Sequence, residues 1–182
     1  MRFILIIFIS LSFFIHSTSY AQTNIENKNP IFPIFNLTDL LPFTPGRTLD
    51  KIPKELGEGT DLTIEKALKV KRYLLTHQTY KFPVWVQYNN NTILDSYIRL
   101  PSYFLHDSFF QSLINRYGQH SKYIQKDSAA VYIWTKTSIK RVYSGTCTIT
   151  CFPIYFSMIS QVRNGFPSTY IPLLELFEMQ LL

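Results

Sequence analysis

The sequence predicts an α+β fold: a single domain in which a small antiparallel sheet packs against two main helices. Apolar residues recur at helical spacing over residues 61–77 and again over 107–117. Between and after these segments lie runs rich in β-branched and aromatic residues, which favour strands. The order helix, hairpin, helix and strands is typical of α+β proteins. We expect residues 61–182 to form this domain, with an extended proline-rich arm before it and a short helix at its end.

The chain opens with the features of a cleavable secretory signal peptide. Arg2 supplies positive charge, residues 3–15 are apolar and uncharged, and the small residues Ser19 and Ala21 stand two positions apart. The apolar segment is short for a membrane span, which needs about 20 residues. We therefore expect cleavage between Ala21 and Gln22, export to the periplasm or outside the cell, and no transmembrane segment in the mature form.

Size and charge limit what the mature protein can be. Removing residues 1–21 from the 182 leaves 161, which suffices for one ordinary domain with its own core. The whole chain has a formal net charge of +6, and loss of Arg2 with the signal leaves +5. A moderate basic excess favours anionic surfaces, but here it is spread along the chain. No nucleic-acid partner is predicted.

Residues 22–60 are expected to form a flexible to extended arm. Residues 22–30 are polar and show no periodicity, as in a flexible terminus. Residues 31–60 combine apolar pairs with several prolines, which exclude a long helix or a central strand. The apolar residues also argue against a free linker. An arm packed across the body, or waiting for a partner, fits residues 31–60 best.

The first helix is predicted over residues 61–77. Asp61 can cap it by accepting backbone N–H bonds. Its apolar stripe consists of Ile64, Ala67, Leu68, Leu74 and Leu75. The densest basic group of the chain is interpreted as its solvated face, with an anion contact as the alternative: Lys66, Lys69, Lys71 and Arg72.

A hairpin and a second helix are predicted next. The hairpin strands cover residues 82–88 and 92–100, and the asparagines between them form the turn. The second helix spans residues 107–117, with Asp107 or Ser108 as its cap, and Gly118 ends it.

The remaining chain is predicted to be mostly strand. A polar loop over residues 119–128 precedes strands over 130–134, 139–143 and 146–157. Ser144–Gly145 is interpreted as a turn or bulge between the last two. Pro172 begins the short terminal helix.

The two cysteines, Cys147 and Cys151, pose a geometric problem. Export to an oxidising compartment makes a disulfide the default expectation. In a straight strand, however, their Cα atoms would stand ~13 Å apart, and a disulfide needs roughly 4.4–6.8 Å. Either the segment turns or bulges, or both thiols stay buried and reduced; a metal-bound or reactive thiol is the third alternative.

No catalytic or metal-binding motif is present in the sequence. The zinc spacings, the nucleophile-elbow motif and phosphate-binding glycine loops are all missing, so no metal or cofactor is predicted. The weak catalytic candidates are His106, His120, Asp107 and Cys151. Asp107 is interpreted first as a helix cap.

Aromatic residues on the predicted strands are the candidates for binding. Trp85, Tyr97, Tyr132 and Trp134 could form a platform for sugar or peptide on one sheet face. The alternative is that these rings fill the core, because strand alternation sends half of them inward.

The function that these observations favour is an exported, non-enzymatic binding module. Two apolar segments support this interpretation: the proline-rich arm at residues 31–45 and the segment at 170–182. Each is a plausible docking element. The expected partner is another protein or an anionic surface. Two alternatives stay open: a small secreted hydrolase assembled from His and Asp or Cys, and a peripheral binder of membrane surfaces.

Overall fold

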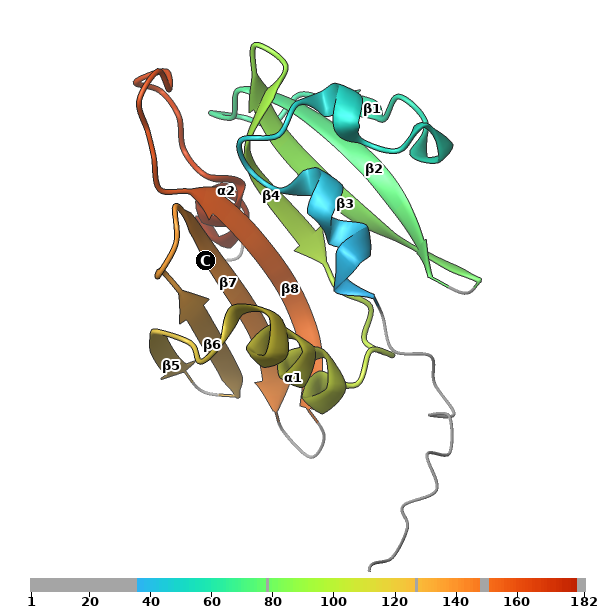
Figure 1. Ribbon diagram of the computed structural model, residues 1–182, viewed down its shortest axis with the longest axis vertical. Helices are drawn as coiled ribbons and strands as arrows, with labels where there is room; N and C mark the ends of the chain where they lie inside the picture. Colours follow the sequence, from blue (N-terminus) through green and yellow to red (C-terminus); the bar gives the residue numbers. More distant parts are fainter. Residues whose placement is uncertain (1–35, 78, 127, 148–150, 180–182) are drawn as a thin grey trace, which may run out of the picture. The chain divides into compact units, whose positions relative to one another are not determined.

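Eight antiparallel strands form one sheet in the computed structural model, in the order β1-β2-β3-β4-β8-β7-β6-β5 (Figure 1). The structure describes residues 36–77, 79–126, 128–147 and 151–179. The strands are β1 (Thr60–Leu62), β2 (Lys69–His77), β3 (Tyr80–Asn89), β4 (Thr92–Arg99), β5 (Lys122–Lys126), β6 (Ala129–Trp134), β7 (Ile139–Cys147) and β8 (Cys151–Ser160). The helices are α1 (His106–Tyr117), α2 (Leu173–Met179) and the short 3-10 helices η1 (Leu37–Phe43), η2 (Leu49–Lys51) and η3 (Lys54–Leu56).

The sheet consists of two four-stranded meanders joined along β4 and β8. Strands β1 to β4 form one meander and β5 to β8 the other, and β4 pairs with β8 from Asp95↔Ile159 to Arg99↔Tyr155. The 3-10 helices precede the first meander and α1 precedes the second. The two halves therefore repeat one order of elements, although the sequence shows no internal repeat.

The predicted fold class is wrong, because the sheet dominates and residues 61–77 contain no helix. These residues form β1 and β2, and β2 pairs with β3 along its length, from Lys69↔Tyr88 to His77↔Tyr80. The apolar spacing in this segment fits a helix locally, but packing and cross-strand hydrogen bonds with β3 override that preference. The sheet therefore packs against one main helix, α1, and several short helical segments.

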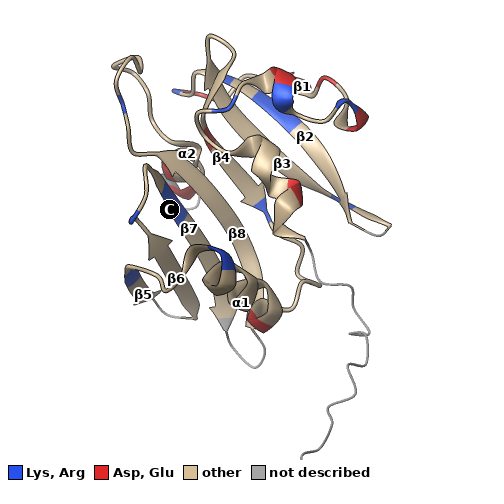
Figure 2. Ribbon diagram, in the orientation of Figure 1, with Lys and Arg blue, Asp and Glu red and all other residues tan. Residues whose placement is uncertain are grey.

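Because residues 61–77 form strands, the basic residues at positions 66–72 do not share one face. Side chains alternate between the two faces of a strand, so Lys69 and Arg72, both exposed, point to opposite sides of β2. Lys71 forms an ion pair with Asp61 of β1, with 3.2 Å between Nζ and Oδ1. Figure 2 shows basic residues spread over several elements, including β2, α1 and β5.

Other predictions from the sequence are confirmed. The hairpin is β3 and β4, with Asn90 and Asn91 at positive φ in its turn. The second helix is α1, and Gly118 ends it at φ 76° with its N–H bonded to the Ile114 carbonyl. The sheet register shifts between Ser144 and Gly145, as expected of a bulge.

Two further predictions from the sequence are corrected. The predicted polar loop at 119–128 contains the edge strand β5. The predicted strand over 146–157 is interrupted, because β7 ends at Cys147 and β8 begins at Cys151.

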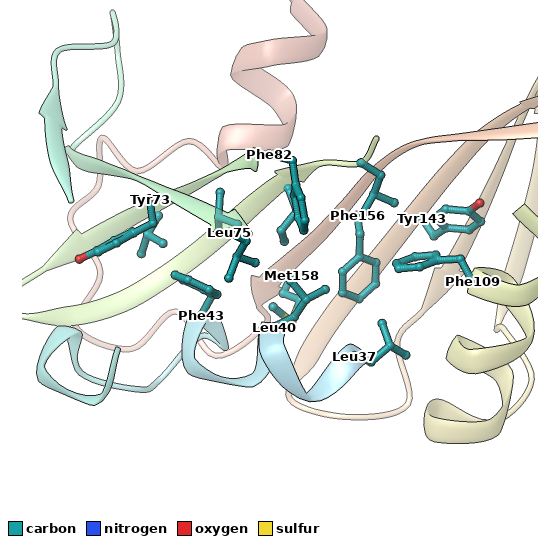
Figure 3. Packing of buried hydrophobic residues seen from close by; sticks show 14 of the residues in the cluster. Leu37, Leu40, Phe43, Tyr73, Leu75, Phe82, Phe109, Tyr143, Phe156 and Met158 are labelled. Atoms are coloured by element: carbon teal, nitrogen blue, oxygen red, sulfur yellow. The ribbon is translucent and has the colours of Figure 1, made fainter. Parts of the chain in front are cut away.

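One face of the sheet is covered by η1 and α1. Leu37, Leu40 and Phe43 of η1 are buried against β-strand residues such as Tyr73 and Met158, and Phe109 of α1 packs beside Tyr143 and Phe156 (Figure 3). The described part of the proline-rich arm is therefore part of the core.

The other face of the sheet is covered by α2. Leu173, Leu174 and Leu176 are buried there with Tyr97 and Tyr155. The described part of the apolar carboxy-terminal segment is thus also packed within the molecule. Among the residues that the structure describes, no helix has the length and apolar character needed to cross a membrane.

Candidate functional site

A pocket of about 450 Å³ lies between the start of α1 and the start of β8. Its walls come from two stretches that are far apart in sequence, one before and within the first turn of α1, the other just after the β7–β8 connection. The lining residues are Ser102, Phe104, Leu105, His106, Asp107, Ser108, Cys151 and Phe152. Ligand pockets in proteins typically enclose about 300–1,000 Å³, so this pocket is large enough for a small molecule.

The local sequence leaves the amino end of α1 without a side-chain cap. Leu105 occupies the cap position in an extended conformation and makes no side-chain capping bond. The predicted caps are therefore wrong: Asp107 and Ser108 lie inside the first turn. The first N–H groups of a helix have no partner within the helix, so the amides of this turn are donors beside the pocket. The Asp107 carboxylate lies near the positive end of the helix dipole.

His106 is the most buried polar side chain of the pocket, at 7% exposure. Its Nδ1 lies 2.7 Å from the hydroxyl of Tyr143 on β7, which is completely buried. Within the described part of the chain, that hydroxyl has no other hydrogen-bond partner. We assign the fully buried hydroxyl as the donor to Nδ1, because its proton would otherwise have no acceptor. The neutral ring then carries its proton on Nε2, for which the described residues provide no acceptor.

Gly145 makes the approach of His106 to β7 possible. A Cβ at this position would lie 2.8 Å from His106 Nδ1 and 3.1 Å from the Phe152 carbonyl oxygen. Both distances are shorter than ordinary van der Waals contact, so the strand needs a residue without a side chain here. The absence of a side chain at Gly145 thus has a role in the site that the sequence did not indicate.

Burial lowers the pKa of His106 below its ordinary value of 6.5, although the Asp107 charge opposes this effect. Burial also raises the pKa of Tyr143. Both groups are therefore neutral near pH 7, which is consistent with a neutral hydrogen bond between them. In the assigned tautomer, the neutral His106 that lines the pocket has its N–H at Nε2.

Apolar side chains form the rim of the pocket. Leu105 is 54% exposed and Phe152 is 40% exposed. Phe104 also lines the pocket and is buried, and its ring contacts those of Tyr103 and Phe109. An apolar rim around a few polar groups is the usual composition of a ligand pocket.

Three of the four weak catalytic candidates line this pocket, and the fourth does not. His106, Asp107 and Cys151 belong to it. His120 lies in an aromatic group beside α1, with its ring centroid 5.2 Å from that of Tyr132 and 6.1 Å from that of Trp134. In the described part of the chain, no group of three or more His, Cys, Asp or Glu residues is placed to hold a metal ion.

The two cysteine positions are opposite each other in the sheet. Cys147 and Cys151 are the last register pair of β7 and β8. The straight-strand geometry assumed from the sequence therefore does not apply, because the chain reverses direction between them. The side chain of Cys147 lies outside the described part of the structure, so the disulfide remains a prediction.

The four aromatic binding candidates lie on opposite faces of the sheet. Trp85 and Tyr97 pack against Phe177 of α2, with ring centroids 5.4 and 4.7 Å from it. Tyr132 packs against Phe110 of α1 at 4.3 Å. On that same face Trp134 is buried, and its Nε1 donates to the Gly118 carbonyl. These four rings do not form a single platform.

A second group of polar residues is buried beneath α2. Asp95 is fully buried, and its Oδ2 accepts hydrogen bonds from the Tyr170 hydroxyl at 2.7 Å and from Gln87 Nε2 at 2.8 Å. Its Oδ1 accepts a bond from the Leu173 amide at 3.2 Å. Burial raises the pKa of Asp95 to about 6. Because these donors come from β3 and from the segment leading into α2, the group holds that segment on the sheet.

Sequence reasoning missed the residues that give the pocket its shape. Phe104, Leu105 and Phe152 have no motif, and Tyr143 was one aromatic among many. The signal that could have found them was the chemistry at His106–Asp107, but its partner strand lies far along the chain. Comparisons of this chain with protein-family profiles, with curated proteins and with solved structures gave no match.

Proposed function

We propose that this protein is an exported, non-enzymatic binding protein whose pocket at the start of α1 takes a small apolar ligand that carries a hydrogen-bond acceptor. The observation that carries the proposal is the pocket itself, which is lined by the exposed apolar residues Leu105 and Phe152 and by the buried His106, whose Nε2–H we assign as the donor. The rim would bury the apolar part of the ligand, and the donor would fix its polar group.

The evidence for binding comes from the pocket and not from the two apolar segments that suggested it in the sequence. The described parts of the arm and of the carboxy-terminal segment are buried against the sheet, as Phe43 and Leu173 illustrate at 0% exposure. Neither therefore supports docking to a partner protein. The pocket and its apolar rim support binding of a ligand independently of those segments.

A fluorescent probe that combines both features of the ligand tests the proposal. Anilinonaphthalene sulfonate has apolar rings and an anionic acceptor. We expect saturable binding that the variants Leu105→Glu and Phe152→Glu weaken strongly. Leu74→Glu is the matched control, because Leu74 is 44% exposed on β2 and does not line the pocket. Equal probe binding by all three folded variants, or none by the wild type, would overturn the proposal.

A hydrolase is the second candidate, because His106, Asp107 and Cys151 line one pocket. The hydrogen bond from Tyr143 argues against it. In the tautomer assigned above, the remaining ring nitrogen carries the proton and is not free to accept one as a general base. Hydrolysis of p-nitrophenyl esters that is lost in His106→Gln would favour the hydrolase over the binding protein.

Export is part of the proposal and has its own test. It rests on the sequence of residues 1–21, which lie outside the described part of the chain. We expect the mature protein in the periplasm or the medium to begin at Gln22. An intact mass that still includes residues 1–21 would contradict export by a cleaved signal.

A further inference from the structure

We infer that Cys147 and Cys151 form a disulfide that closes the end of the β7–β8 hairpin and holds one wall of the pocket in place. The first part of this inference rests on backbone register. The second part, the effect on ligand binding, rests on the proposed function.

The register places the two cysteines at a distance suited to a disulfide. Cys147 pairs with Cys151 directly across the two antiparallel strands. Residues opposite each other in such strands have Cα atoms about 4.5–5.5 Å apart. Disulfides span about 4.4–6.8 Å between Cα atoms, so the register brings the two residues within the range of a bond.

The cross-link would lie at the pocket wall. Cys151 and its neighbour Phe152 both line the pocket. Phe152 pairs with Thr146, and its carbonyl oxygen lies against Gly145, the residue that makes room for His106. Fraying of this hairpin end would move Phe152 and loosen the wall that faces His106. A bond between the last residues of the two strands prevents that fraying.

The chemistry is a thiol–disulfide exchange. The two thiols lose two protons and two electrons as the sulfur–sulfur bond forms, and a disulfide-bearing oxidant, such as a protein disulfide, is reduced to two thiols. An oxidising compartment supplies such an oxidant, in agreement with the proposed export. Because the closed loop is short, the bond removes little chain entropy and acts mainly on local shape.

Intact mass gives the first readout, and it does not depend on ligand binding. The full chain has only two cysteines. In protein purified from the oxidising compartment without reductant and denatured before alkylation, we expect no adduct until a reductant is added, and then two adducts. Adducts formed without reductant would overturn the disulfide, whatever the probe shows.

Hydrogen exchange and probe binding then test the effect on the pocket. In the reduced, alkylated protein and in Cys147→Ser, we expect faster amide exchange in β8 near Phe152 and several-fold weaker binding of anilinonaphthalene sulfonate. Unchanged exchange in both forms would overturn the role in holding the wall. If the oxidised protein shows no probe binding, the proposed function fails, while the mass and exchange results still decide the disulfide and its local effect.

Discussion

The hydroxyl of Tyr143 and Nδ1 of His106 lie 2.7 Å apart, in a hydrogen bond that joins β7 to the first turn of α1 beside the pocket. This bond decides which nitrogen of His106 carries the proton, and so what the pocket offers a ligand. It also connects two elements that the sequence does not relate to each other.

Removal of the Tyr143 hydroxyl should destabilise the protein. In Tyr143→Phe, the buried Nδ1 of His106 loses its donor, and an unsatisfied buried polar group costs about 1–3 kcal/mol. Urea denaturation measures the change. Tyr123→Phe is the control, because the hydrogen bond from the Tyr123 hydroxyl to Gln125 is exposed and should contribute about 0.5 kcal/mol or less. Equal effects of the two variants would contradict the role of this bond.

A methyl group at Gly145 should lower the stability of the protein, because it would clash with His106. Gly145→Ala places a Cβ 2.8 Å from His106 Nδ1, and overpacking of this kind costs about 1–3 kcal/mol. A double-mutant cycle with His106→Ala isolates the contact. We expect the cost of the methyl group to shrink when the imidazole is absent. Additive effects would show that the Phe152 carbonyl, at 3.1 Å, causes the strain instead.

Asp95 should make the protein less stable as the pH rises from about 4 to about 6. Its pKa is raised from 3.8 to about 6 in the folded state, so folding favours the protonated carboxyl. Stability from this group is fully present below pH 3.8 and is lost as the pH rises through 6, by an amount on the order of 3 kcal/mol. Unfolding midpoints at several pH values should show this slope in the wild type and not in Asp95→Asn. An equal slope in both proteins would refute the prediction.

His106 should titrate below its ordinary range, and its linkage has the opposite sign. Burial lowers its pKa below 6.5, so the folded state favours the neutral ring. Stability from this group is present above pH 6.5 and is lost as the pH falls through the folded-state pKa. NMR of the ring Cε1–H, assigned by its disappearance in His106→Asn, should give a midpoint below 6.5. A midpoint at or above 6.5 would mean that the ring is more solvated than its burial indicates.

Phe43 should be essential to the core, although it lies in the segment expected to be an arm. It is completely buried against the sheet, and Phe43→Ala should cost about 3–5 kcal/mol in unfolding free energy. Leu74→Ala, at a residue that is 44% exposed, should cost about 0.5 kcal/mol or less and serves as the control. A small effect at Phe43 would mean that η1 contributes little to the fold.

Where local signals agreed with the surrounding structure, the sequence predicted the elements correctly. The hairpin at β3–β4 follows from alternating residues and an asparagine turn, and α1 from its apolar stripe and Gly118. Three of the pocket residues, His106, Asp107 and Cys151, were candidates from their chemistry alone. What the sequence could not show was that they meet, because 45 positions separate His106 from Cys151 and no local pattern reports such a distance.

By itself, the sequence determined the features that depend on neighbouring residues: the turn at Asn90, the end of α1 at Gly118, and the signal-like composition of residues 1–21. Only the tertiary structure decided between helix and strand for residues 61–77, because β2 gains hydrogen bonds and buried contacts from β3 that a local helix would forgo. The pocket, too, depends on contacts that only the tertiary structure brings together. The absence of a Cβ at Gly145 gives His106 room against β7, and the antiparallel pairing of β7 with β8 places Cys151 opposite Cys147.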